Sequence, residues 1–175
     1  MIIEYEGRRP TIGRNVYIAP TAVIVGDVAI GEGTSVWFGA VIRGDLAPIR
    51  IGRNTNIQDN GTLHVDLDVP LSIGDGVTIG HSAVVHGCTV EDDCLIGMSA
   101  VVLNHACIRR GSVVGAGSVV REGQVIGPNH LVAGVPAVFK KDLPASATDR
   151  FEGPVADYLL LSRRYQNPKK TNSRI

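Results

Sequence analysis

Aliphatic residues recur at steps of six along most of this 175-residue chain. The steps run from Ile12 to Val132, with one step of nine that ends at Ile51, one of ten that ends at Ile73 and one of five that ends at Val90. All twenty stops are aliphatic, and glycine directly follows eight of them. One inward aliphatic side chain per six residues is the pattern of a parallel β-helix, so the hydrophobic pattern predicts an all-β fold.

The period resembles that of hexapeptide-repeat proteins, whose left-handed β-helix has triangular coils of three hexapeptides. Twenty stops then correspond to six to seven coils, with glycines where the backbone turns at the corners. A β-sandwich would instead show strand spacings of about 8–12 residues. We therefore predict a left-handed parallel β-helix of six to seven triangular coils, followed by a C-terminal α-helix.

The pattern divides the chain into five parts. We predict a lead-in over residues 1–11, the β-helix over 12–135, a linker over 136–153, a helix over 154–166 and a polar tail over 167–175. Proline at position 154 suits the first turn of that helix. The long steps place insertions near residues 44–48 and 65–70, and loops that interrupt a regular repeat often carry function.

Charge and composition exclude several partners. Lys+Arg and Asp+Glu both number 17, so the chain lacks the basic excess that nucleic acids or anionic membranes require. No apolar run has the length of a membrane span, and the first residues lack the pattern of a secretory signal. The three cysteines are an odd number without C-x-x-C spacing, which favours reduced thiols. A cytoplasmic location is the resulting expectation.

The repeat also predicts where polar side chains meet. Arg43, His64 and His86 each directly follow an inward residue of the same column, so they occupy equivalent outward positions on successive coils. Neighbouring strands lie about 4.7–4.9 Å apart, which allows His64 and His86 to share one metal ion. Neutral imidazole is the commonest protein ligand for such ions.

His81 belongs to a different face of the predicted prism. It lies two residues after Ile79, and the same position one coil earlier holds Asp59. A single chain therefore offers two histidines on one face and one on another. If these faces meet between neighbouring chains, the contact is heterologous and can close as a ring of three, with one metal at each interface.

A set of motifs runs in the order Arg43-Gly44-Asp45, Gln58-Asp59-Asn60, His64, and His81-x4-His86-Gly87. This set is similar to that of the gamma-class carbonic anhydrase family of trimeric left-handed β-helices, over residues from about 10 to 166. The resemblance implies that His64, His81 and His86, from two subunits of a homotrimer, bind zinc, with ferrous iron as the alternative. It also implies roles near the metal for four further residues: an interface ion pair of Arg43 with Asp45, a substrate-orienting Gln58, and an interface-supporting Asp59. A tyrosine of the C-terminal helix lies near the site in relatives, and Tyr158 is the candidate, with Tyr165 as the alternative.

The activity that the resemblance implies is reversible hydration of carbon dioxide to bicarbonate. Three neutral imidazoles leave zinc an open position for water, whose pKa falls to about 7, an effect best known from carbonic anhydrases. One departure concerns proton transfer: residues 46–48 contain no acid, and the loop after His64 keeps only Asp66 and Asp68. A weak or inactive metal-bearing scaffold is therefore an alternative. Another is a hexapeptide-repeat acyltransferase, in which His105 or His130 would act as general base toward a CoA-type donor.

Overall fold

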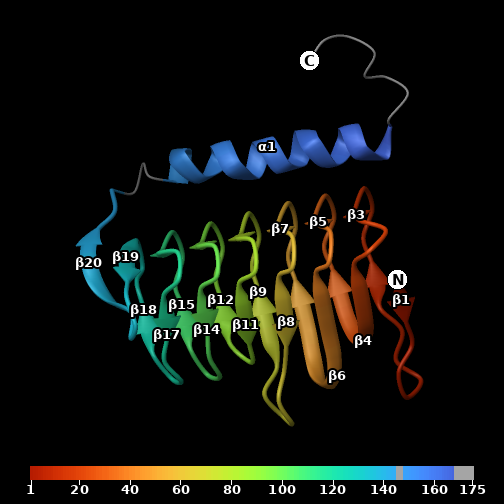
Figure 1. Ribbon diagram of the computed structural model, residues 1–175, viewed down its shortest axis with the longest axis horizontal. Coiled ribbons are helices and arrows are strands. Elements are labelled where there is room, and N and C mark those ends of the chain that lie inside the picture. The colour runs from red at the N-terminus through yellow and green to blue at the C-terminus, as the bar shows by residue number, and fades with distance from the viewer. Residues whose placement is uncertain (145–147, 168–175) are drawn as a thin grey trace.

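The chain forms a row of stacked triangular coils with one helix lying alongside (Figure 1). The computed structural model describes residues 1–144 and 148–167, and for residues 148–152 the backbone alone. Within these ranges the chain forms twenty strands and one helix. The parallel pairing from coil to coil confirms the predicted β-helix.

The strands stack on three faces. The first face holds, in stacking order, β1 (Ile2–Ile3), the first half of β4 (Val23–Ile30), the first half of β6 (Val41–Ile51), β8 (Thr62–His64), β11 (Val84–His86), β14 (Val101–Val102) and β17 (Val119–Val120). The second face holds β2 (Thr11–Ile12), the second halves of β4 and β6, β9 (Leu71–Ile73), β12 (Thr89–Val90), β15 (Cys107–Ile108) and β18 (Val125–Ile126). The third face holds β3 (Tyr17–Ile18), β5 (Ser35–Val36), β7 (Asn56–Ile57), β10 (Thr78–Ile79), β13 (Leu95–Ile96), β16 (Val113–Val114), β19 (His130–Ala133) and the antiparallel β20 (Val138–Asp142). Because β4 and β6 continue round a corner, the first two faces form one 12-stranded sheet and the third an 8-stranded sheet.

The strand register confirms the predicted columns. Leu63 pairs with Ile42 on one side and with Val85 on the other, so the inward aliphatic residues lie directly above one another. From Ile24 to Val132 none of these stops is more than 5% exposed. Val85 is fully buried and Val84 only partly so, which identifies Val85 as the inward residue of its coil. The core is therefore a continuous aliphatic stack, as a solenoid requires.

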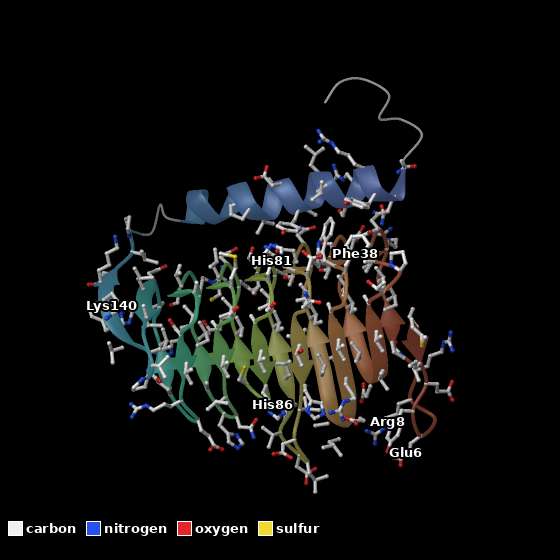
Figure 2. The ribbon with its side chains drawn as sticks, in the orientation of Figure 1. Glu6, Arg8, Phe38, His81, His86 and Lys140 are labelled. Atoms are coloured by element: carbon white, nitrogen blue, oxygen red, sulfur yellow. The ribbon has the colours of Figure 1, made fainter. Side chains whose placement is uncertain are left out.

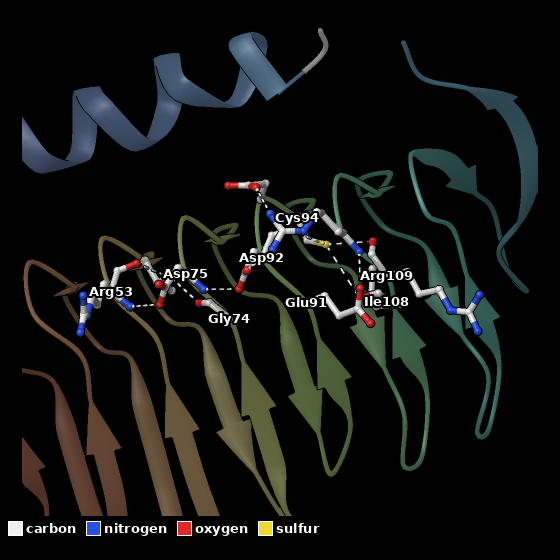
Figure 3. Close-up of polar contacts among 11 residues, drawn as sticks. Arg53, Gly74, Asp75, Glu91, Asp92, Cys94, Ile108 and Arg109 are labelled. Atoms are coloured by element: carbon white, nitrogen blue, oxygen red, sulfur yellow. Dashed lines mark hydrogen bonds and ion pairs between the residues drawn. The ribbon is translucent and has the colours of Figure 1, made fainter. Parts of the chain in front are cut away.

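Carboxylates satisfy backbone donors at the corners of the coils (Figure 3). Asp75 Oδ1 accepts a hydrogen bond from the Arg53 amide at 2.6 Å, and Asp92 Oδ1 accepts one from the Asp75 amide at 2.9 Å. Glu91 Oε2 accepts a hydrogen bond from the backbone amide of Arg110 at 2.8 Å. Since corner residues have no complete ladder of strand hydrogen bonds, each such contact supplies an otherwise missing partner.

The two insertions differ from each other. Residues 45–48 form a bulge within β6: Gly44 pairs with Gly26 and Ile49 pairs with Val28, so four residues lie opposite Asp27 alone. This bulge holds the three extra residues of the first predicted insertion. Ala47 of this bulge is buried, so the segment stays close to the core. Residues 65–70 do leave the coil, as a short projecting turn held by a bridge between Asp66 and Val69. Leu67 at its tip is 68% exposed.

The C-terminal segment also departs from the expected boundaries. The predicted linker over 136–153 contains β20, and helix α1 (Thr148–Gln166) begins six residues before Pro154. The tail from residue 168 onward lies outside the described residues. Figure 1 shows α1 running along the stack, where it contacts β3, β5 and β10 of the third face. No helix of the described chain is long and apolar enough to cross a membrane.

An aromatic cluster fastens α1 to the third face. The buried Trp37 packs edge-on against Tyr158 and Tyr165 of the helix, with ring centroids 5.1 and 5.4 Å apart, and against Tyr17 at 5.1 Å. Edge-to-face pairs at such separations are favourable beyond their buried area. The cluster thereby fixes where the helix lies over the coils.

Candidate metal centre

The three candidate histidines lie on two faces of the prism, and Figure 2 labels His81 and His86, one from each face. His64 ends β8 and His86 ends β11, so both lie on the first face. His81 follows β10 on the third face, beneath α1. Because a strand alternates its side chains, a histidine directly after an inward aliphatic residue points outward. The predicted separation of His81 from the other two is thus what the structure shows.

His64 and His86 form a close pair. Their residues are register partners on adjacent strands, and His64 Nδ1 lies 3.0 Å from His86 Nε2. Both side chains are partly buried. Two nitrogens bound tetrahedrally to one zinc at 2.0–2.1 Å would be about 3.3–3.4 Å apart. The observed separation is close to that of two ligands of one ion.

Asp45 holds the outer nitrogen of His64. Its Oδ1 lies 3.1 Å from His64 Nε2, and its Oδ2 pairs with Arg43. Burial alone would raise the pKa of Asp45, but hydrogen bonds from Arg43, its own backbone amide and His64 outweigh it, so the pKa is lowered. Burial, with a further contribution from Arg43, lowers the pKa of His64. An ionised Asp45 and a neutral His64 are the states that metal ligation requires.

Hydrogen bonding fixes the tautomer of both rings. An ionised carboxylate only accepts, so His64 Nε2 carries the proton that faces Asp45 and Nδ1 keeps its lone pair. The Asn104 oxygen also only accepts, so His86 Nδ1 donates to it at 2.6 Å and Nε2 keeps its lone pair. If both rings are neutral in these tautomers, the lone pairs of His64 Nδ1 and His86 Nε2 face each other across 3.0 Å. A divalent cation between them turns this repulsion into ligation, so the pair fits a metal.

His81 has a matching arrangement on the third face. Its Nδ1 lies 2.9 Å from Asp59 Oδ2, and its Nε2 lies 3.4 Å from the hydroxyl of Tyr158. Burial, then the nearby Asp59, raises the pKa of Tyr158, so this phenol stays protonated and can donate. Gln58, His81 and Tyr158 also line a cavity of about 460 Å³ under α1. The carboxylate again supports one ring nitrogen of the histidine, while the other nitrogen faces the Tyr158 hydroxyl.

The structure thus divides the expected site residues into two groups. Arg43, Asp45, His64 and His86 lie on the first face, whereas Gln58, Asp59, His81 and Tyr158 lie on the third. Of the two tyrosines, Tyr158 contacts His81, and Tyr165 packs against Tyr17, Trp37 and Phe38. In the described part of the chain no three His, Cys, Asp or Glu side chains are arranged so that they alone could hold a metal ion.

Two asparagines that the sequence did not single out belong to these groups. Asn104 bonds His86, as described, and its Nδ2 donates to Asp66 at 3.4 Å. Asn56, which is buried, accepts a hydrogen bond from Gln58 Nε2 at 3.1 Å and fixes that amide. The repeat register does place Asn104 near His86. Asn104 lies on the next coil, at the position equivalent to Gly87, which directly follows His86.

The histidines that an acyltransferase would use lie elsewhere. His130 pairs with Asp142 at 3.5 Å and stacks edge-on against Phe139 of β20. His105 is exposed at a corner with φ of 61°. The Asp142 side chain that pairs with His130 is 83% exposed, so this pair lies at the open surface.

Comparisons with known proteins agree with the repeat. The family model for the bacterial transferase hexapeptide (six repeats) matches residues 9–44. The model for the hexapeptide repeat of succinyl-transferase matches residues 70–104 and 89–122. A crystal structure of a hexapeptide transferase family protein from Anaplasma phagocytophilum superposes with a TM-score of 0.90 at 36% identity, and covers 94% of this chain and 98% of that one.

Two curated relatives are similar over most of the chain. The carbonic anhydrase of Geobacillus kaustophilus is 45% identical over 166 residues, which is 95% of this chain and 91% of the relative. Gamma carbonic anhydrase 2, mitochondrial, of Arabidopsis thaliana is 44% identical over 142 residues. The chain covers about half (51%) of the length of that second relative.

Proposed function

This chain belongs to the gamma carbonic anhydrase family of hexapeptide-repeat enzymes, and we propose that it hydrates carbon dioxide reversibly to bicarbonate at a metal site shared between subunits. The site consists of His64 and His86 from one chain and His81 from its neighbour in a homotrimer. A cytoplasmic location stays a prediction, and the Arabidopsis relative is named as mitochondrial.

One observation carries the proposal. His64 Nδ1 and His86 Nε2 lie 3.0 Å apart, and a carboxylate and an amide hold their outer nitrogens. This is the pattern of metal-binding histidines, whose second nitrogen donates to a carboxylate or a carbonyl oxygen. A pair offers two ligands, whereas a catalytic zinc site needs three with one open position. His81, supported by Asp59 on another face, supplies the third ligand when a second chain docks.

The chemistry of the reaction divides between the metal and the chain. When bound, zinc or ferrous iron acts as a Lewis acid that lowers the pKa of a coordinated water to near neutrality. Imidazole nitrogens suit either ion, so the ligand set does not choose between them. Neutral imidazoles also leave the charge of the ion uncompensated, which favours the deprotonated water.

The chain's own residues bind and orient the reactants. Gln58 is held by Asn56, so its carbonyl oxygen is directed to one side of the cavity that it shares with His81. Asp59 fixes the tautomer of His81, and Tyr158 provides a hydroxyl at its Nε2. Aliphatic residues such as Leu95 and Val113 also line this cavity, so part of its wall is apolar.

We expect purified protein to contain about one zinc or iron per chain and to hydrate carbon dioxide faster than a His64→Ala control. Metal content is measured by elemental analysis, and the rate by stopped-flow with protein that was loaded with metal under anaerobic conditions. Metal without a rate above the control would favour a scaffold, which is consistent with the lack of an acid in residues 46–48. A metal-free native trimer that transfers an acetyl group from acetyl-CoA to an amine would instead show that the protein is an acyltransferase.

A further inference from the structure

Asn104 is the one described side chain that joins the metal pair to the projecting turn after β8. Its Oδ1 lies 2.6 Å from His86 Nδ1, and its Nδ2 donates to Asp66 Oδ2 at 3.4 Å. Asp66 bridges to Val69 at the base of the turn over residues 65–70. The three side chains Asp66, Asn104 and His86 therefore form a hydrogen-bonded chain from the turn to a candidate ligand.

The two contacts of Asn104 determine each other. An amide has one acceptor end and one donor end, and the carboxylate of Asp66 accepts only. The amino group of Asn104 must therefore face Asp66, which directs its oxygen toward His86. That oxygen in turn requires a proton on His86 Nδ1 and leaves the lone pair on Nε2, the atom that faces His64. The carboxylate in the turn thus sets the tautomer of the histidine.

Gly87 makes room for this contact. A Cβ at that position would lie 2.6 Å from Asn104 Oδ1 and 2.7 Å from Val69 Cγ1. The backbone of Gly87 also has φ of +47°, which disfavours other residues. The glycine directly after His86 is therefore needed for the amide to reach the imidazole ring.

We propose that Asn104 is a positioning residue for the metal, that Asp66 orients it, and that together they hold His86 in the tautomer that binds. This inference rests on the proposed metal site. It also assigns a role to Asp66 that differs from proton transfer, since the carboxylate is engaged by the amide. Outer partners of this kind contribute about 10- to 100-fold in metal affinity.

The test compares four proteins: the unaltered chain, Asn104→Leu, Asn104→Ser and the exchange Asp66→Asn with Asn104→Asp. Leucine removes both hydrogen bonds, and serine is polar but too short to reach His86. In the exchange variant, the carboxylate now at position 104 would accept from His86, and the amide now at position 66 would donate to that carboxylate. Zinc dissociation constants are measured by competition with a chelator, and the visible spectrum of the cobalt(II) form reports ligand geometry.

We expect Asn104→Leu and Asn104→Ser to weaken zinc binding about 10- to 100-fold and to alter the cobalt spectrum, with trimer mass unchanged. The exchange variant should bind zinc within about threefold of the unaltered chain, because the hydrogen-bonded chain is restored. Unchanged affinity in Asn104→Ser would overturn the inference, as would an exchange variant as weak as the serine variant. Failure of the unaltered chain to bind zinc would instead refute the proposed metal site itself. If Asn104→Leu does not assemble into a trimer, the zinc affinities of the serine and exchange variants test the inference.

Discussion

Replacing His81 by alanine is expected to remove metal from the whole trimer and to reduce carbon dioxide hydration to the uncatalysed rate. The remaining pair, His64 and His86, supplies two of the three ligands, and a two-ligand site does not hold zinc through purification. Elemental analysis should give less than about one tenth of a metal per chain, and stopped-flow should show no acceleration.

A second histidine variant controls for this loss. His105 is exposed at a corner with φ of 61°, and it is the neighbouring Asn104, not His105, that bonds His86. Asparagine tolerates that conformation better than alanine does, so His105→Asn removes an imidazole with little strain. This variant should keep the full metal content and rate. Metal retained by His81→Ala at the level of His105→Asn would show that His81 is no ligand.

Replacing Leu63 by alanine is expected to lower the free energy of unfolding by about 2–5 kcal/mol. Leu63 is fully buried in the aliphatic column between Ile42 and Val85, so its loss leaves a cavity between two coils. Denaturant unfolding is measured with a chelator present and at one protein concentration, because metal and oligomerisation both add apparent stability.

Leu67 provides the matched control for this change. It is the same residue type four positions later, but it lies at the tip of the projecting turn and is 68% exposed. Leu67→Ala should change the free energy of unfolding by no more than about 0.5 kcal/mol. Equal effects of the two substitutions would mean that the aliphatic column is not the core of the fold.

The aliphatic period was sufficient to predict the fold and the stacking of side chains. A coil of three hexapeptides places residues 18 apart in register, and counting the two insertions brought Arg43, His64 and His86 onto successive coils. The same count placed His81 one coil after Asp59, and these two side chains do form a pair. Local rules worked here because each coil contacts only its neighbours.

The aliphatic period did not predict the C-terminal strand β20 or the start of helix α1. Strand β20 consists of exposed residues that pair antiparallel with β19, so it carries no aliphatic period. Helix α1 begins at Thr148, so Pro154 lies inside the helix and not in its first turn, where the residue type alone had placed it. The first insertion forms a bulge within β6, in which Ala47 is buried.

The supporting amides were less accessible from the sequence than the histidines were. Asn104 and Asn56 act through hydrogen bonds to other side chains, and asparagine is also common at the corners of the coils, where residues such as Asn54 and Asn60 adopt positive φ. Residue type and spacing do not separate these two uses. Side-chain positions were needed to show which asparagines face the site.

Restoring metal by mixing two inactive proteins tests most directly whether the site is shared between chains. His81→Ala keeps the His64 and His86 pair, and His64→Ala keeps His81. When equal amounts are unfolded and refolded together, each interface of a trimer has a chance of about one in four of joining the two intact halves. We predict that the mixture recovers about a quarter of the metal and of the hydration rate of the unaltered protein. No recovery above the separately refolded variants, in trimers shown by mass to contain both chains, would contradict a site built from two subunits.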